Sequence, residues 1–60
     1  MRTYLIRLYN SRDQVTVEET VEAECIGEAM KKAEAIKNDA NAEKEYSGLF
    51  MIKAITIKEQ

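Results

Sequence analysis

The sequence predicts a single small α+β domain of ββαβ order, in which a three-stranded sheet of order 2-1-3 carries one helix on one face. Apolar residues alternate with a period of two over residues 3–9 and again over 15–24, as they do in strands. The period changes to 3.6 at residue 26, and a run rich in β-branched residues follows over 49–58. We assign residues 1–60 to one domain, because a chain this short buries only about 60% of the surface that its unfolded form exposes.

The first two elements are expected to form a hairpin. Tyr4, Ile6 and Leu8 share one side of the first strand, and its other side is partly apolar too, which favours a central position in the sheet. Residues 10–14 are polar turn formers and predict the connecting loop. Glu19 interrupts the apolar side of the second strand, so we expect a bulge or an exposed strand end there.

An amphipathic helix is predicted from residue 26 onward. Cys25 is expected at its N-cap position, and Glu28 three residues later completes a degenerate capping box. Polar residues weaken the end of the helix, so we expect residues 38–47 to connect it to the last strand. The apolar stripe expected to face the sheet consists of Ile26, Ala29, Met30, Ala33, Ile36 and Ala40.

The last strand is predicted over residues 49–58, with residues 58–60 as a frayed tail. A helical crossover to a parallel strand is right-handed in about 98% of cases, and the simplest such topology places the first strand in the middle. One helix covers one face, so the other face stays open. We expect that face to carry Leu5, Tyr9 and either Met51 or Phe50.

The composition gives little support to catalytic chemistry. The sequence has no histidine to act as a general base, and Gly27 and Gly48 are isolated rather than part of a phosphate-binding loop. Cys25 is the only cysteine, which excludes an intrachain disulfide and leaves a nucleophile without a basic partner. We therefore expect no enzyme activity, no metal and no cofactor, and we interpret Cys25 as a half-buried cap residue.

Neither export nor membrane insertion is predicted. The longest apolar stretch, residues 49–52, is far shorter than the roughly 20 residues that a transmembrane helix needs. Residues 1–4 lead directly into the first strand and lack the apolar core of a signal peptide. A cytoplasmic location is therefore expected.

Negative charge is concentrated in one segment. Residues 15–28 contain five glutamates and no basic residue, although the net charge of the chain is only −2. One interpretation is protective, because charges on an edge strand prevent edge-to-edge aggregation and would pair with Arg2 or Arg7 on the next strand. The other is functional, because an acidic stripe would give fast, salt-sensitive association with a basic partner. The two are compatible, and the pairing would involve Glu18, Glu22 or Glu24. The five glutamates of the segment are Glu18, Glu19, Glu22, Glu24 and Glu28.

Nucleic-acid binding is not favoured. The basic residues are scattered and the isoelectric point is about 5.1, whereas a phosphate-binding surface is usually basic. Tyr4, Tyr9 and Phe50 would form a stacking platform for bases if they shared one face of the sheet. Aromatic side chains of a small sheet are more often buried in its core.

The strand-to-helix junction resembles that of a known group of proteins. Residues 23–34 read Ala-Glu-Cys-Ile-Gly-Glu-Ala-Met-Lys-Lys-Ala-Glu. This run is similar to the junction of small phage accessory proteins of ββαβ build, nearest the host RNA polymerase inhibitor of podovirus coliphages, which has the pattern Ala-Glu-x-Leu-x-Glu-Ala-Leu-x-x-Ala-Glu. Gly48 stands where a glycine opens the last strand of that family, and Lys53 and Ile55 stand at two positions that the family fills with arginine. The resemblance implies a ββαβ fold and a host protein, RNA polymerase, as the partner.

These observations lead to the hypothesis of a small protein-binding module, a phage-type accessory protein that binds and inhibits or modulates a host protein in the host cytoplasm. Two alternatives remain open. One is a structural homodimer or assembly subunit, joined through the open face or through strand edges, and the other is a weak single-stranded nucleic-acid binder. The candidate partner-binding residues are Glu18, Glu22, Glu24, Glu28, Lys53, Leu5 and Tyr9.

Overall fold

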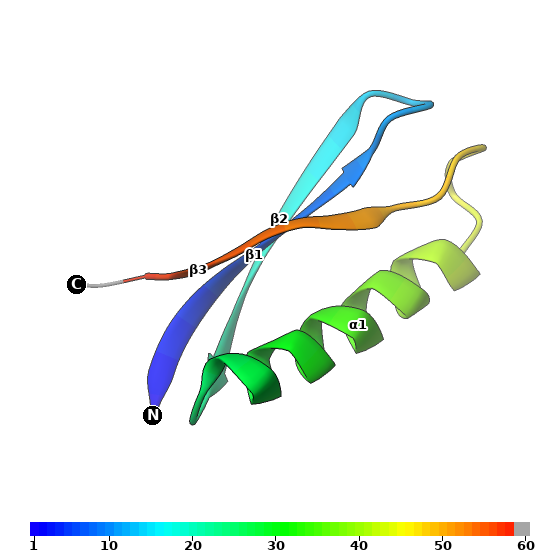
Figure 1. Cartoon of the computed structure of the whole chain (residues 1–60). Coiled ribbons are helices and arrows are strands. Elements are labelled where there is room, and N and C mark those ends of the chain that lie inside the picture. The colour runs from blue at the N-terminus through cyan, green and yellow to red at the C-terminus, as the bar shows by residue number, and fades with distance from the viewer. Residues whose placement is uncertain (59–60) are drawn as a thin grey trace.

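The computed structural model describes residues 1–58 and contains the four elements in the predicted order. The strands are β1 (Arg2–Asn10), β2 (Val15–Ala23) and β3 (Met51–Ile57), and the helix is α1 (Ile26–Ala42). The sheet order is β2-β1-β3 with both neighbouring pairs antiparallel, so the predicted fold class is confirmed. Figure 1 shows the sheet as one layer and α1 as a second layer on one of its faces. Of the predicted frayed tail, Lys58 is held against β1, because its N–H donates a hydrogen bond to the carbonyl oxygen of Thr3 at 2.8 Å, so the prediction is wrong at this residue. Residues 59–60 lie outside the described residues.

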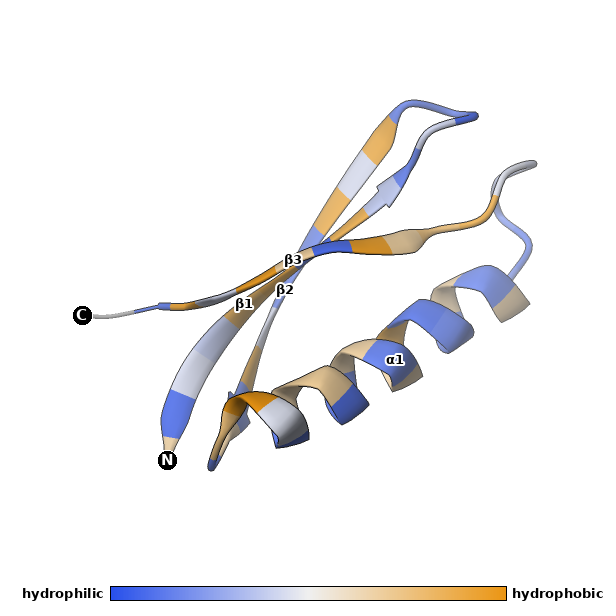
Figure 2. Cartoon of the chain, viewed as in Figure 1, coloured by the Kyte–Doolittle hydropathy of each residue, from blue (hydrophilic) through white to orange (hydrophobic). Residues whose placement is uncertain are grey.

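The core lies between α1 and the sheet face that the helix covers. Tyr4, Ile6 and Leu8 of β1 are fully buried there, in agreement with the period-two pattern. Burying side chains of this size contributes about 1.5–3 kcal/mol each to stability. Figure 2 shows apolar residues along the strands and hydrophilic residues on the β1–β2 turn and after α1. The connections at this end of the domain are therefore polar, and the apolar residues are concentrated in the strands.

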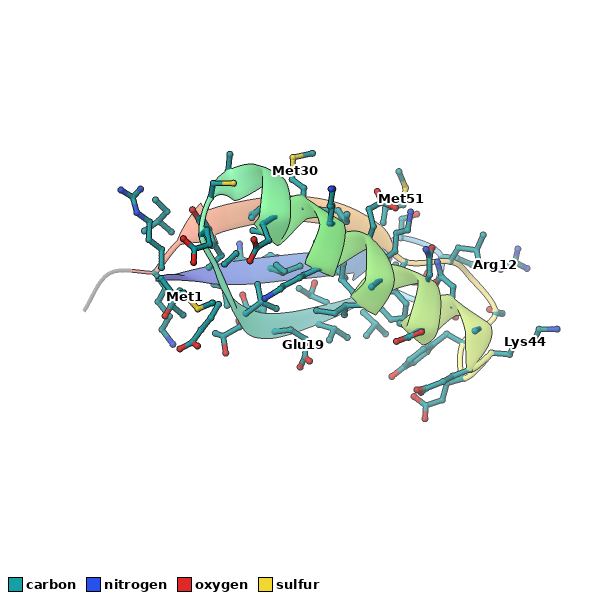
Figure 3. The ribbon with its side chains drawn as sticks, turned by 90° about the horizontal axis from the view of Figure 1, so that it is seen from below. Met1, Arg12, Glu19, Met30, Lys44 and Met51 are labelled. Atoms are coloured by element: carbon teal, nitrogen blue, oxygen red, sulfur yellow. The ribbon has the colours of Figure 1, made fainter. Side chains whose placement is uncertain are left out.

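α1 packs through small side chains rather than through its largest apolar residues. Ala29 and Ala33 are fully buried, which brings the helix close to the sheet. The prediction that Ile26 and Met30 share this buried stripe is wrong, since they are 50% and 53% exposed. Met30 lies roughly a quarter turn from the line through the two alanines. Figure 3 shows that α1 crosses the sheet diagonally, so that Met30 projects past the β3 edge.

The irregularity of the sheet lies in β3 and not in β2. β2 pairs with β1 in an unbroken register that continues on both sides of Glu19, so the expectation of a bulge or an exposed strand end at this residue is wrong. Glu19 needs no bulge because its side chain is exposed at the outer edge of the sheet. On the other side, Ala54 and Ile52 pair with successive residues of β1, which leaves Lys53 as the extra, bulged residue.

The helix runs further than its polar residues suggest. α1 continues through Asn38 to Ala42, so the connection to β3 is shorter than expected. Asn41 stabilises this last part, because its side-chain amide forms two hydrogen bonds with the backbone of Phe50. Beyond the helix, Lys44 adopts the left-handed conformation with φ of 56°, which turns the chain back toward the sheet.

One carboxylate ties the β1–β2 turn to the connection before β3. Asp13 accepts hydrogen bonds from the N–H of Gly48 at 2.8 Å and from the hydroxyl of Ser47 at 2.9 Å. The fully buried Asn10 donates to the same carboxylate at 2.8 Å and accepts from the Asp13 N–H at 3.2 Å. The pKa of Asp13 is lowered, mainly by the bond from Gly48. A Cβ on Gly48 would overlap the Asn10 side chain and lie 2.6 Å from the Cβ of Arg12. The close approach of Gly48 to the β1–β2 turn therefore requires glycine.

The start of α1 agrees with the sequence only in part. Cys25 is the N-cap residue with an extended backbone, but its side chain makes no capping hydrogen bond. Glu28 instead accepts a hydrogen bond from the N–H of Glu24 at 3.4 Å. Cys25 is exposed, so the expected half-burial is wrong, because the turn between β2 and α1 stands clear of the core (Figure 1). No helix within residues 1–58 is long and apolar enough to cross a membrane.

Candidate protein-binding surfaces

No other element of residues 1–58 covers the sheet face opposite α1, as predicted (Figure 1). Leu5 and Tyr9 lie on this open face and are half-buried. Met51 of β3 is the cross-strand partner of Tyr9, and Met51 is 68% exposed. Phe50, the other residue considered for this face, lies in the core instead. The open face therefore carries scattered apolar side chains and no continuous apolar patch.

Two polar contacts cross the open face. Nε and one terminal nitrogen of Arg7 contact Oε2 of Glu18 at 2.7 and 2.6 Å, between residues that pair directly across β1 and β2. Nζ of Lys53 lies 4.9 Å from the ring centroid of Tyr9, a cation–π geometry. The predicted pairing of an arginine with the acidic strand is thus confirmed at Arg7. Glu18 is consequently engaged within the chain.

The other predicted glutamates gather at the turn between β2 and α1. Glu22 lies near the end of β2, Glu24 follows the strand, and Glu28 lies in the first turn of α1. Glu28 also forms an ion pair with Lys32 at 3.8 Å, and Lys32 donates a hydrogen bond to the carbonyl oxygen of Glu22. The structure thus brings three of the predicted glutamates together and leaves Glu18 apart from them.

The two positions that the resemblance relates to arginines have different environments. Lys53 occupies the bulge in β3 and is exposed. Ile55 pairs with Ile6 and packs against the core beneath α1. These two positions therefore do not form a joint basic surface in this chain.

The aromatic residues do not share a face of the sheet. Tyr4 and Phe50 are buried beneath α1, whereas Tyr9 lies on the open face. The stacking platform considered for single-stranded nucleic acid is therefore absent from the described strands.

A groove that the sequence did not predict lies between β2 and the C-terminal half of α1. Its volume is about 360 Å³, within the range of about 300–1,000 Å³ that is usual for ligand pockets. The floor is the outer margin of the core, the rim carries carboxylates, and no basic side chain lines it. We call it the acidic groove; its floor consists of Leu8, Val17, Ile36, Ala40, Tyr46 and Phe50, and its rim of Glu19, Asp39, Glu43 and Glu45.

Two carboxylates of the rim occupy an electrostatically unfavourable place. Asp39 and Glu43 lie four residues apart at the end of α1, and its last turn contains no basic residue. The C-terminal end of a helix carries partial negative charge, so each acid there costs of the order of 0.3–1 kcal/mol. None of the ion pairs found within residues 1–58 involves either residue. Such a departure from local preference, without a compensating contact, is typical of functional sites.

The charge pattern of the sequence indicates residues 15–28 as the acidic surface and does not indicate the end of the helix. A signal for the groove was present, because residues 36, 39, 40 and 43 share one helical face. This helical face forms a groove with Glu19 only because the end of α1 lies beside β2. The periodicity of a single helix or strand does not predict how two elements are placed relative to each other.

Within residues 1–58, no group of three or more acidic or cysteine side chains is placed to hold a metal ion. Comparison with protein-family models, with curated proteins and with solved structures finds no match to this chain. The surface geometry and chemistry described above therefore provide the basis for assigning a function.

Proposed function

We propose that this chain is a protein-binding module that associates with a basic surface of another protein through the side of the molecule bounded by β2. One observation carries this proposal: β2 is a regular nine-residue edge strand with carboxylates on both of its faces. Glu18 and Glu22 lie on the open face, and Glu19 lies on the side of α1. Such an edge offers backbone groups for strand addition and a negative field that attracts a basic partner.

The resemblance of residues 23–34 supports an accessory role of phage type, in which the chain binds and inhibits or modulates a host protein. RNA polymerase is the first target to test, because it is the partner that the resemblance implies. A small charged domain acts in this way by covering part of a larger partner. The exposed side chains along β2 support that mode of action more than they support catalysis.

The test measures affinity after single charge reversals. Purified bacterial RNA polymerase, and proteins captured from a bacterial lysate, are presented to the intact chain at low and high salt. Glu22→Lys is expected to weaken binding at low salt, whereas Glu34→Lys, an identical charge change on the exposed face of α1, is the matched control. Equal affinities for the wild type and Glu22→Lys, with folding confirmed by circular dichroism, would count against the proposed surface.

A second candidate is self-association along the β3 edge. Exposed apolar side chains favour it, since Met30 and Met51 both project from this edge in Figure 3, and Ile57 of β3 is 46% exposed. The bulge at Lys53 opposes it by interrupting the row of backbone groups along the strand. Sedimentation velocity separates the two functions, because a monomer at every concentration excludes the dimer.

A further inference from the structure

We propose that the acidic groove binds an extended, basic segment of a partner protein, with one apolar side chain of that segment inserted between β2 and α1. This inference rests on the proposed function and names the chemistry of the partner. It also places the main contact on the helix side of β2 and away from the glutamates of the open face.

The floor of the groove suits an apolar side chain. Leu8 and Phe50 are buried at its base, and Val17 and Ile36 are only half-buried beside them. Tyr46 stands edge-on against Phe50, with ring centroids 5.5 Å apart and an interplanar angle of 84°. An apolar side chain in this position would continue the core outward and remove these surfaces from water.

The rim favours positive charge on either side of that apolar residue. Glu19 comes from β2 and Asp39 from α1, Glu43 is the C-cap residue of that helix, and Glu45 belongs to the connection that follows. The rim carboxylates do not converge on one point, since the described residues contain no acidic cluster arranged for a metal ion. Cations spaced along a chain fit this rim better than a single ion does. They would also relieve the unfavourable charge at the end of α1.

The free edge of β2 would align the bound segment along the strand. Every second residue of an edge strand directs its N–H and C=O away from the neighbouring strand, so an extended segment can add to it. Val17 and Glu19 line the groove from this strand. Figure 3 shows Glu19 projecting from the edge opposite Met30 and Met51, where no other strand lies. Because alternate side chains of an extended chain share one side, a basic–x–apolar–x–basic pattern would meet the floor and the rim together.

The experiment uses the full chain and a fluorescein-labelled nonapeptide. Arg, Arg, Leu, Arg and Arg occupy the alternate positions of this peptide, and Thr occupies the positions between them. Fluorescence anisotropy at low salt measures its affinity, and ¹⁵N–¹H correlation spectra of the labelled chain locate it. We expect the amide signals of Val17, Glu19 and Ala40 to shift, and those of Thr3 and Leu5 on the open face to stay in place.

Two charge-matched variants test the rim. Glu43→Gln combined with Glu45→Gln neutralises two carboxylates of the groove without changing its shape, and we expect affinity to fall about tenfold. Glu24→Gln combined with Glu34→Gln removes the same charge from exposed residues outside the groove, and we expect a change of about twofold or less. A peptide with Ser in place of Leu tests the floor and should bind about tenfold more weakly.

Equal losses in the two double variants would show general charge attraction and overturn the proposal. Equal affinities of the Leu and Ser peptides would overturn it too, because the floor would then be unused. If a partner found under the proposed function loses affinity with Glu22→Lys but not with Glu43→Gln combined with Glu45→Gln, the groove is not the site, while the protein-binding function stands. A larger loss with this groove variant than with Glu24→Gln combined with Glu34→Gln, for both the peptide and that partner, supports the inference.

Discussion

The side chain of Asn41 pairs with the backbone of Phe50 in the way that a neighbouring strand would. Its Oδ1 accepts a hydrogen bond from the Phe50 N–H at 2.7 Å, and its Nδ2 donates to the Phe50 carbonyl oxygen at 3.3 Å. Phe50 is 4% exposed and belongs to the main core cluster. One amide of the helix thus satisfies the backbone of a buried residue outside any strand, where an unpaired polar group would be costly.

Replacing Asn41 should therefore destabilise the domain. Asn41→Ala leaves the N–H and C=O of Phe50 without partners, and we expect the free energy of unfolding to fall by about 1–3 kcal/mol. Urea unfolding followed by circular dichroism measures it. Asn38→Ala is the control, since Asn38 is exposed on the same helix, and its effect should stay within about 0.5 kcal/mol. Similar losses in both variants would contradict the role given to Asn41.

The two glycines should respond to alanine with opposite signs. Gly48→Ala forces a Cβ against Asn10 and Arg12, which we expect to cost about 1–3 kcal/mol as overpacking does in cores. Gly27→Ala places a Cβ in the first turn of α1, with only the Cys25 sulfur nearby at 3.9 Å. Alanine is the better helix former by up to about 1 kcal/mol, so this variant should unfold at a higher urea concentration than the wild type.

Acid should weaken the link between the β1–β2 turn and the connection before β3. The pKa of Asp13 is lowered below its ordinary value of 3.8, chiefly by the hydrogen bond from the Gly48 N–H. A carboxyl with a lowered folded-state pKa contributes fully above the unfolded value, and that contribution is lost as the pH falls through the folded value. Stability should therefore decline on acidification below about pH 4.

Asp13→Asn tests this dependence. The variant should be less stable than the wild type at pH 7, and its unfolding midpoint should change less between pH 5 and pH 2. Ser47→Ala is the control, because it removes one hydrogen bond to the carboxylate and leaves the carboxylate in place. Parallel pH profiles for the wild type and Asp13→Asn would argue against the link.

The left-handed residue after the helix offers a stabilising change. Lys44 has φ of 56°, a conformation that costs an L-residue about 1 kcal/mol and that glycine adopts freely. Lys44→Gly should therefore raise the thermal midpoint by a few degrees, since about 1 kcal/mol shifts it by roughly 4–8 °C in a domain of this size. Lys44→Ala removes the same charge and keeps the backbone restriction, so it should bring no such gain.

Most of the fold could be predicted because each element carries its own period. Alternation placed Tyr4, Ile6 and Leu8 in the core, and the 3.6-residue repeat placed Ala29 and Ala33 against it. The partial apolar character of both sides of β1 predicted its central position. The errors arose where tertiary packing decides, as at Asn38, where the contact of Asn41 with Phe50 carries α1 beyond a polar stretch.

The binding surfaces were less accessible to prediction. The cross-strand pair of Arg7 and Glu18 followed from hairpin register, which a short turn largely determines. The acidic groove did not, because its walls come from positions as distant in sequence as Glu19 and Glu45. Both positions line the groove, and α1 reaches that side of the molecule because it crosses the sheet diagonally (Figure 3).

The bulge at Lys53 makes the two edges of the sheet unequal as sites of growth. If β2 of one copy joined β3 of the next, the contact would repeat head to tail without closing, as in a filament. The interrupted backbone and the lysine of β3 oppose that contact, whereas β2 keeps a regular row of backbone groups. If a partner strand adds at β2, as proposed above, the bulge at Lys53 makes a second addition at the β3 edge less favourable, which works against growth of the sheet from one chain to the next.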